Sequence, residues 1–282
     1  MNMPEKMLLR RVAQQLPLLA LLFIWLGIFP SCQSSAGNAP GLPESAWGER
    51  YAYSYDISKS VQKPPGSVPI TIAVVNPYYK EEDSALGTQM FGKIGKGFAA
   101  SMGSDLDKVL IAKGVTTTGP FPSLDEITYG QKKDAALILA PRLFVTTEIK
   151  YSPPEAVMRS IGTTMERRFS MNVTGWISFN MQEPLSGQKM WIKRLELEPV
   201  HVDGVEIFEA IPRYGNDGCG GRPLVGYDTS DKRLYVGQVD ALAGALKEMY
   251  PVIISQFEKY LDTEEMLQLQ EKGKEIRASK VY

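Results

Sequence analysis

Residues that can act as nucleophiles, general bases or metal ligands are scarce in this chain. Its 282 residues include one histidine, His201, and two cysteines, Cys32 and Cys219. A zinc site of the H-E-x-x-H kind needs two histidines, and an α/β-hydrolase nucleophile needs a G-x-S-x-G segment, which the sequence lacks. We therefore expect no catalytic residue, no metal and no cofactor, and predict that the protein is not an enzyme.

Two segments approach a catalytic pattern without completing it. Residues 87–94 (GTQMFGKI) have the glycines and the lysine of a P-loop, but isoleucine stands where the Mg²⁺-binding Ser or Thr belongs. We therefore expect no nucleotide. Glu196 and Glu198 are two apart on a predicted strand, so they would share a face and could flank a sugar, although solvated carboxylates are the commoner outcome. A hydrolase would need Glu196, Glu198, His201 or Cys219 to gather in one pocket.

The N-terminus has the pattern of a bacterial export signal. Three basic residues among the first eleven precede an apolar run from Leu16 to Phe29, which is shorter than the roughly 20 residues of a membrane span. The run ends at Cys32 in a segment similar to the lipobox of bacterial lipoproteins. We predict a lipoprotein-type signal over residues 1–31, lipidation of Cys32 (with palmitate, for example), and a flexible tether over residues 32–48.

Alternatives to this anchor remain open. Cleavage after Ala36 would release a soluble protein, and an uncleaved segment would be a helical anchor. Gln33 follows the cysteine in place of the Asp that retains lipoproteins in the inner membrane, so the resemblance implies the outer membrane. With Cys32 lipidated, Cys219 is a free thiol or pairs with a second chain.

The charge balance excludes one class of partner. The chain has 31 Lys and Arg against 32 Asp and Glu, and without residues 1–31 it keeps 28 and 31. A mildly acidic mature chain is a poor match for nucleic acid, so we expect no nucleic-acid partner.

Apolar periodicity predicts the elements of the first half. The run 68–75 (VPITIAVV) is typical of a buried strand, as is 135–140 (AALILA), which continues past Pro141 toward Ile149. Residues 84–113 predict a helix with an apolar residue every four positions, closed by Gly114. Residues 123–126 (SLDE) have the pattern of a capping box.

A long hairpin is the clearest signal. Residues 169–181 alternate apolar and polar side chains, 183–187 (EPLSG) form a turn, and a return strand runs from Lys189 to about Glu198. Trp176 lies among Ser, Thr and Asn on the polar face, a combination that suits sugars, so it is our candidate ligand-binding residue. Residues 203–237 predict a long loop, with His201 just before it at a turn.

The last part of the chain is predicted to be helical. An apolar seam extends from Leu242 to Leu261, Pro251 predicts a kink or break within it, and Asp262 is placed to cap a final helix. The fold class is α/β (α+β): a single domain with a mixed sheet, a long antiparallel hairpin, packed helices and a C-terminal helix. We place the domain at residues 49–262 and a helical tail at 263–282.

Several segments together resemble the neuraminyllactose-binding hemagglutinin family of bacterial outer-membrane lipoproteins. They are the signal, the strand before Asn76-Pro77 with the helix after it, residues 131–140 (QKKDAALILA), the hairpin 175–187 and the helix from Asp240 to about Lys274. The resemblance implies a lipid-anchored adhesin, associated with the flagellar sheath in some members. The Lys/Arg-rich segment proposed to bind sialic acid corresponds to residues 146–168, where the basic residues are scattered, so no binding residue is carried over.

These observations lead to one expected function and one alternative. We expect an exported lipoprotein, held in the outer membrane by its lipid, that binds a glycan or protein partner as an adhesin or envelope component. The alternative is a lipoprotein that faces the periplasm and binds an envelope or flagellar assembly partner.

Overall fold

The computed structural model describes residues 51–59, 62–80, 84–87, 91–159, 162–209, 211–213, 224–226 and 234–280. The chain divides into two units, residues 1–44 and 45–282, and all described residues belong to the second. The predicted signal, Cys32, the tether and Cys219 therefore lie outside the described residues.

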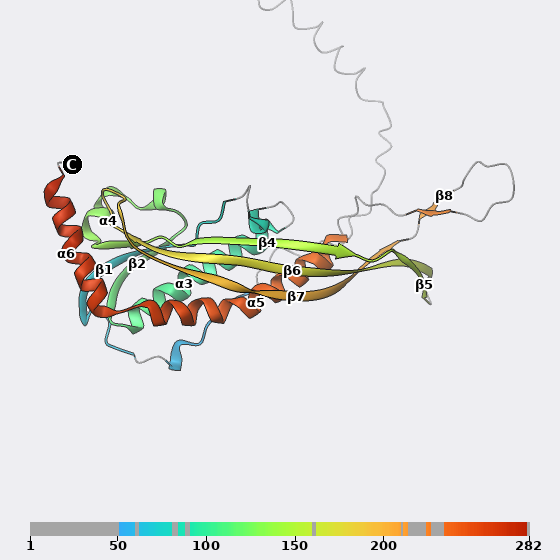
Figure 1. Ribbon diagram of the computed structural model, residues 1–282, viewed down its shortest axis with the longest axis horizontal. Helices are drawn as coiled ribbons and strands as arrows, with labels where there is room; N and C mark the ends of the chain where they lie inside the picture. Colours follow the sequence, from blue (N-terminus) through green and yellow to red (C-terminus); the bar gives the residue numbers. More distant parts are fainter. Residues whose placement is uncertain are drawn as a thin grey trace, which may run out of the picture. The chain divides into compact units, whose positions relative to one another are not determined.

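Helices and strands follow in the order that the sequence class requires. They are η2 (Ile57–Lys59), β1 (Val68–Val75), η3 (Ala85–Gly87), α3 (Gly92–Ala112), β2 (Val115–Phe121), η4 (Leu124–Glu126), α4 (Tyr129–Asp134), β3 (Leu137–Leu139), β4 (Arg142–Tyr151), β5 (Glu155–Arg159), β6 (Gly162–Gln182), β7 (Lys189–Glu209), β8 (Ile211–Arg213), β9 (Leu224–Gly226), α5 (Leu234–Tyr260) and α6 (Thr263–Ser279). The predicted α/β class, with a mixed sheet, a long hairpin and packed helices, is confirmed (Figure 1).

A seven-stranded mixed sheet is organised around β6. The strand order is β2-β1-β3-β6-β4, with β1 parallel to β2 and β3, and with β3 and β4 antiparallel to β6. Strands β3, β4 and β5 follow one another along one edge of β6. Strand β7 pairs with the other edge from Thr164 to Gln182. The hairpin strands are therefore the longest feature of the fold.

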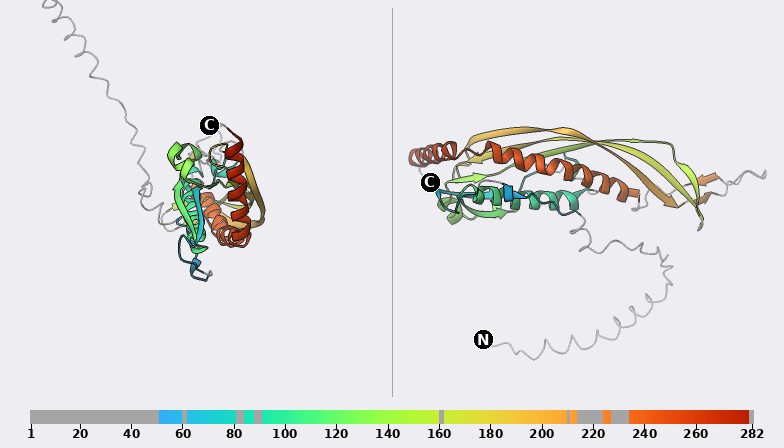
Figure 2. Two further views of the ribbon diagram at one scale, coloured as in Figure 1. Left: turned by 90° about the vertical axis from the view of Figure 1, so that its left-hand side faces the viewer. Right: turned by 90° about the horizontal axis from the view of Figure 1, so that it is seen from below.

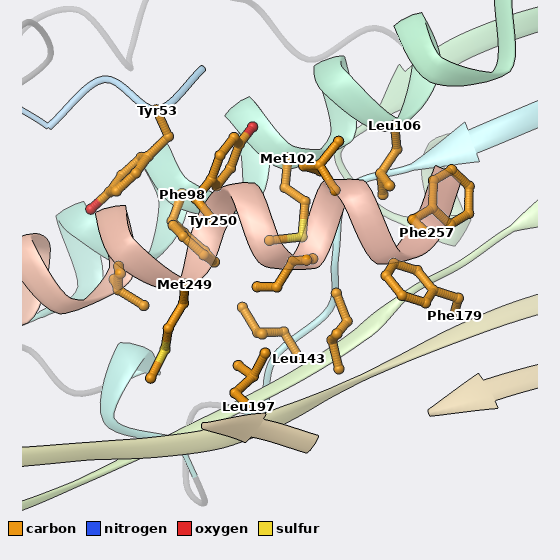
Figure 3. Packing of buried hydrophobic residues seen from close by; sticks show 14 of the residues in the cluster. Tyr53, Phe98, Met102, Leu106, Leu143, Phe179, Leu197, Met249, Tyr250 and Phe257 are labelled. Carbon is orange, nitrogen blue, oxygen red and sulfur yellow. The ribbon is translucent and has the colours of Figure 1, made fainter. Parts of the chain in front are cut away.

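Two helices cover one face of this sheet, which we call the inner face. Helix α3 packs on β1 and β2, while α5 packs on β6 and β7, and the two helices touch each other (Figure 2). Aromatic rings fill the space between them: Phe98 meets Tyr53 edge-on at 4.9 Å between centroids, and Phe179 meets Phe257 at 4.9 Å (Figure 3). We call the opposite face the outer face.

Helix α3 keeps the predicted apolar ladder but begins later than predicted. The ladder residues Ile94, Phe98, Met102, Leu106 and Leu110 are all buried. The helix begins at Gly92 and not at residue 84, because η3 folds back against it. Gly95 permits this contact, since a Cβ there would lie 2.7 Å from the carbonyl oxygen of Leu86. Gly114 ends the helix with φ +88°, as predicted.

The capping box lies at a different position from the predicted one. Ser123 makes no cap hydrogen bond, and only the short η4 follows it. The reciprocal bonds form five residues later, where the Thr128 hydroxyl accepts from the Gln131 amide and the Gln131 side chain accepts from the Thr128 amide. They open α4, whose last turn leads into β3.

The second predicted strand is divided in two at Pro141. The part before it is β3, which lies between β1 and β6. The part after it is β4, which pairs with β6 from Arg142 to Tyr151. Pro141 has no amide hydrogen to donate to a strand partner, so the break occurs where pairing on β6 passes from one strand to the next.

The hairpin is confirmed and is longer than predicted. The apolar series from Phe169 to Met181 is buried on the inner face. On the outer face, residues 170–176 are half-buried as expected, but Ser178, Asn180 and Gln182 are buried. The prediction of a fully wet face is wrong for these three residues. Asn180 illustrates the reason, since its side-chain amide donates to the Ala140 carbonyl at 3.2 Å.

The predicted loop over residues 203–237 is wrong for much of its length. Strand β7 continues to Glu209, β8 and β9 form a separate two-stranded sheet, and α5 already begins at Leu234. The strand continues because Val200, Val202 and Gly204 pair with Val173, Met171 and Phe169 on the inner face. His201 is therefore inside a strand and not at a turn.

The C-terminal helices keep the predicted seam but not the predicted break. Helix α5 runs unbroken through Pro251, which is exposed, while Ile253, Ile254 and Phe257 hold the helix on the sheet. Asp262 caps α6 as predicted, with Oδ1 accepting from the Glu264 amide at 2.9 Å. Helix α6 packs on β1 and β3.

Candidate functional site

The residues that a hydrolase would need are not brought together. Glu196 is paired across the sheet with Trp176, and His201 with Asn172, so they are four residues of β6 apart, or about 13 Å. Glu196 forms an exposed ion pair with Arg194 at 2.6 Å. His201 Nδ1 meets Asn172 Oδ1 at 2.7 Å and Nε2 lies 3.3 Å from Asp203. These are surface interactions of an exposed strand face.

The P-loop-like segment belongs to the core. Phe91 and Ile94 are each 2% exposed and pack among the buried residues of α3. Both residues serve the apolar face of the helix, as the four-residue ladder indicated.

Trp176 lies on the outer face between two neighbours from adjacent strands. Phe144 on β4 stacks on the indole with centroids 5.8 Å apart and planes at 17°. The Arg194 guanidinium on β7 lies 4.3 Å from the ring centroid. Because β4 and β7 flank β6 on opposite sides, both faces of the indole are occupied. A sugar would reach the ring by its edge or by displacing Arg194.

A cavity of about 640 Å³ lies further along the same three strands. It is lined by the triplets 150–152 of β4, 168–170 of β6 and 203–205 of β7. The side chains of the first and last residue of each triplet are on the outer face, and the middle residues form the floor. We call these nine residues the outer-face saddle. Its size falls within the range of ligand pockets.

A buried polar network lies directly beneath the saddle on the inner face. Glu206, whose side chain is fully buried, accepts from Arg167 Nε at 2.9 Å and Nη2 at 2.6 Å. Gln238 of α5 donates to Glu206 and also to the Tyr151 hydroxyl at 2.9 Å. The Arg167 guanidinium lies 4.1 Å from the Tyr151 ring centroid. This network fixes the saddle floor to α5.

The first described residues are clamped onto the helices. Tyr51 donates to Asp240 near the start of α5. Buried Asp105 of α3 accepts from the Tyr55 amide and from the Tyr250 hydroxyl, both at 2.8 Å. Burial raises the pKa of the Tyr250 hydroxyl, with a further contribution from Asp105. Burial likewise raises the pKa of Tyr53. The tyrosines therefore stay neutral and join the segment at 51–55 to α3 and α5.

The hairpin turn is tied to the C-terminus by a second buried carboxylate. Glu183 accepts from the Ser186 amide at 2.5 Å and from Arg277 Nε of α6 at 2.7 Å. Burial acts to raise the pKa of Glu183, but hydrogen bonds from Ser186, Arg277 and Leu185 outweigh it and lower the pKa to about 2. Arg277 also donates to the carbonyls of Lys133 and Ala135 at 3.2 and 2.7 Å.

Sequence reasoning missed these buried ion pairs, although strand parity carried a signal for one of them. Arg167 has the parity of Phe169 and Met171, and Glu206 has that of Val202 and Gly204. A charged residue in register with an apolar series predicts a buried, paired charge. For Glu183 and Arg277, 94 residues apart, no local pattern exists.

Within the part of the chain that the structure describes, no helix has the length and apolarity to cross a membrane. Among the same residues, no group of three or more His, Cys, Asp or Glu side chains is placed to hold a metal ion.

Comparisons with known proteins show likeness at the level of structure. No family model and no curated protein matches the chain. A neuraminyllactose-binding hemagglutinin homolog from Helicobacter pylori matches with a TM-score of 0.47 and 14% identity, over 78% of this chain and 98% of that one. A minor lipoprotein from Acinetobacter baumannii matches with a TM-score of 0.20 and 13% identity, over 67% and 90%. At these TM-scores neither assigns the chain to a family, although the first carries the name that the sequence motifs resemble.

Proposed function

We propose that the chain is an exported lipoprotein, anchored through Cys32 in the bacterial outer membrane, that binds a glycan or protein partner as an adhesin or envelope component. The proposal is that it binds and does not catalyse. The observation that carries it is the hairpin. Its outer face presents a ligand-sized saddle, while helices cover the inner face.

The placement of the charged residues supports binding over catalysis. The buried carboxylates Asp105, Glu183 and Glu206 are each held by groups from other elements, so they connect helices to strands. The exposed candidates Glu196 and His201 are about 13 Å apart. The clamp at Tyr51 also supports the anchor, because the fold is fixed immediately after the predicted tether.

Lipidation is tested by metabolic labelling with a palmitate analogue in a bacterial host. We expect the wild-type chain to be labelled, Cys32→Ala to lose the label completely, and Cys219→Ala, the matched control, to keep it. An inhibitor of the lipoprotein signal peptidase should make the unprocessed form accumulate. Equal labelling of wild type and Cys32→Ala would contradict the lipoprotein proposal.

The direction in which the protein faces separates the adhesin from its alternative, a lipoprotein that faces the periplasm and binds an assembly partner. Protease added to intact cells would cut a surface-exposed chain and spare a periplasm-facing one. Cell fractionation in the same experiment reports whether the chain is in the outer membrane.

Trp176 gives a test of glycan binding with two opposite outcomes. If a sugar stacks on the indole, Trp176→Ala should lose glycan-array signals. Arg194→Ala should raise them, because it uncovers one face of the ring. Binding that neither substitution changes would assign Trp176 to the sheet alone.

A further inference from the structure

We propose that the outer-face saddle seats the phosphate of an anionic lipid headgroup, so that the hairpin lies against the membrane surface. The proposal rests on the lipid anchor at Cys32 and names what the exposed end of the hairpin contacts once the chain is anchored. Its grounds are the charge of the saddle, the apolar side chains beside it and the point where the anchoring segment joins the fold.

The saddle places two cations diagonally across neighbouring strands. Lys150 pairs with Ser170, and Ser152 with Arg168, so ammonium, guanidinium and two hydroxyls surround one cavity. Their Cβ atoms are about 7–8 Å apart along the diagonal, a span that a phosphate with its oxygens can bridge. Ammonium, guanidinium and hydroxyl groups all donate to phosphate oxygens.

The carboxylates nearby do not neutralise both cations. Lys150 is 3.2 Å from Glu148, but both side chains are more than 60% exposed, so the pair is weak and open to competition. Asp203, at the β7 side of the cavity, lies 3.3 Å from His201. The Arg168 guanidinium has no carboxylate partner among the described residues. The cation on β6 is therefore available to a ligand.

Apolar side chains extend the saddle toward one end of the hairpin. Val205 and Ile207 are 44% and 47% exposed on the outer face, and Met158 of β5 is 90% exposed at the same end of the sheet. Cations beside exposed apolar side chains suit the interface of a bilayer, where headgroup phosphates lie next to acyl chains.

The anchoring segment joins the fold at this end. Tyr51 is bonded to Asp240, and two residues earlier in α5 Gln238 is bonded to Tyr151 in the floor of the saddle. Only the 18 residues 33–50 separate Cys32 from Tyr51, and a flexible chain of that length has a mean end-to-end distance of about 24 Å. A lipid on Cys32 thus holds the saddle close to the bilayer.

The test uses the full exported chain with Cys32→Ala, so that no lipid contributes and the result does not depend on lipidation. We expect it to float with phosphatidylcholine vesicles that contain phosphatidylglycerol, and not with phosphatidylcholine alone. Lys150→Gln with Arg168→Gln should lower the partition constant about 25-fold, since each cation near an anionic surface contributes about fivefold. The matched control is Arg142→Gln with Lys189→Gln, the same charge change at the other end of the sheet, and should leave flotation unchanged.

Three results would overturn the proposal: no flotation with anionic vesicles, equal losses in the two double variants, or inorganic phosphate that shifts amide resonances of the saddle while vesicles are not bound. The last would indicate a site for a soluble phosphate. Val205→Ser with Ile207→Ser gives a separate check, because loss of the apolar contact should weaken flotation while leaving its dependence on phosphatidylglycerol. Circular dichroism of each variant confirms that it is folded.

Discussion

Replacing Arg167 by alanine should lower the free energy of unfolding by about 3–5 kcal/mol, one of the largest effects of any single substitution in the described residues. The Glu206 side chain is fully buried, and Arg167 supplies two of its hydrogen bonds. Without the guanidinium, Gln238 alone would face a buried carboxylate. Urea unfolding followed by tryptophan fluorescence measures the change.

Arg168→Ala is the matched control for this prediction. Arg168 is the next residue, has the same side chain and points to the exposed outer face. Its replacement should change stability by less than about 0.5 kcal/mol. Equal losses from Arg167→Ala and Arg168→Ala would show that the buried pair is not a major source of stability.

A double variant tests the physical reason. In Arg167→Met with Glu206→Leu, apolar groups replace both partners, so no charge is left buried. This variant should be more stable than Arg167→Ala, although it has two substitutions. The outcome separates the cost of an unpaired carboxylate from the loss of the interaction itself.

The parts of the fold that local periodicity specifies could be predicted from the sequence. Strand β1 coincides with its apolar run, and the apolar face of α3 is buried where the four-residue ladder placed it. The hairpin was evident because its apolar and polar residues alternate over thirteen positions. In each case the period of the side chains alone decides the element and the face it buries.

The length of β7 could not be predicted because a local signal contradicts its pairing. Pro199 and the pair Asp203-Gly204 both indicate the end of a strand. In the structure Glu198 and Pro199 lie opposite the single residue Thr174, a bulge that accepts a proline, and pairing resumes at Val200. The saddle was missed for the same reason, since one of its three strands lay in the predicted loop.

Contacts between distant segments account for the other differences. Pro251 lies within α5 without breaking it, because the buried side chains that follow hold the helix on the sheet. The start of α3 depends on the fit of Leu86 against Gly95. Neither contact has a signature within one window of sequence.

Arg277→Ala should detach α6 from the hairpin turn and lower the free energy of unfolding by about 3 kcal/mol. The arginine binds Glu183, whose side chain is fully buried, and the carbonyls of Lys133 and Ala135. Its loss would leave the carboxylate with backbone donors only. Lys274→Ala is the matched control, because Lys274 lies one turn earlier in α6 and forms an exposed pair with Glu271. It should cost less than about 0.5 kcal/mol.

The same carboxylate should make stability depend on pH in a defined window. The pKa of Glu183 falls from its ordinary 4.5 to about 2 in the folded chain, so the folded state favours the ionised form. Its contribution is therefore complete above about pH 4.5 and is lost as the pH falls toward about 2. Unfolding measured across this range should show a smaller decline in Glu183→Gln than in wild type, because glutamine does not titrate. Parallel declines in the two proteins would mean that other carboxylates carry the acid sensitivity, and that the link between α6 and the hairpin turn does not depend on the charge of Glu183.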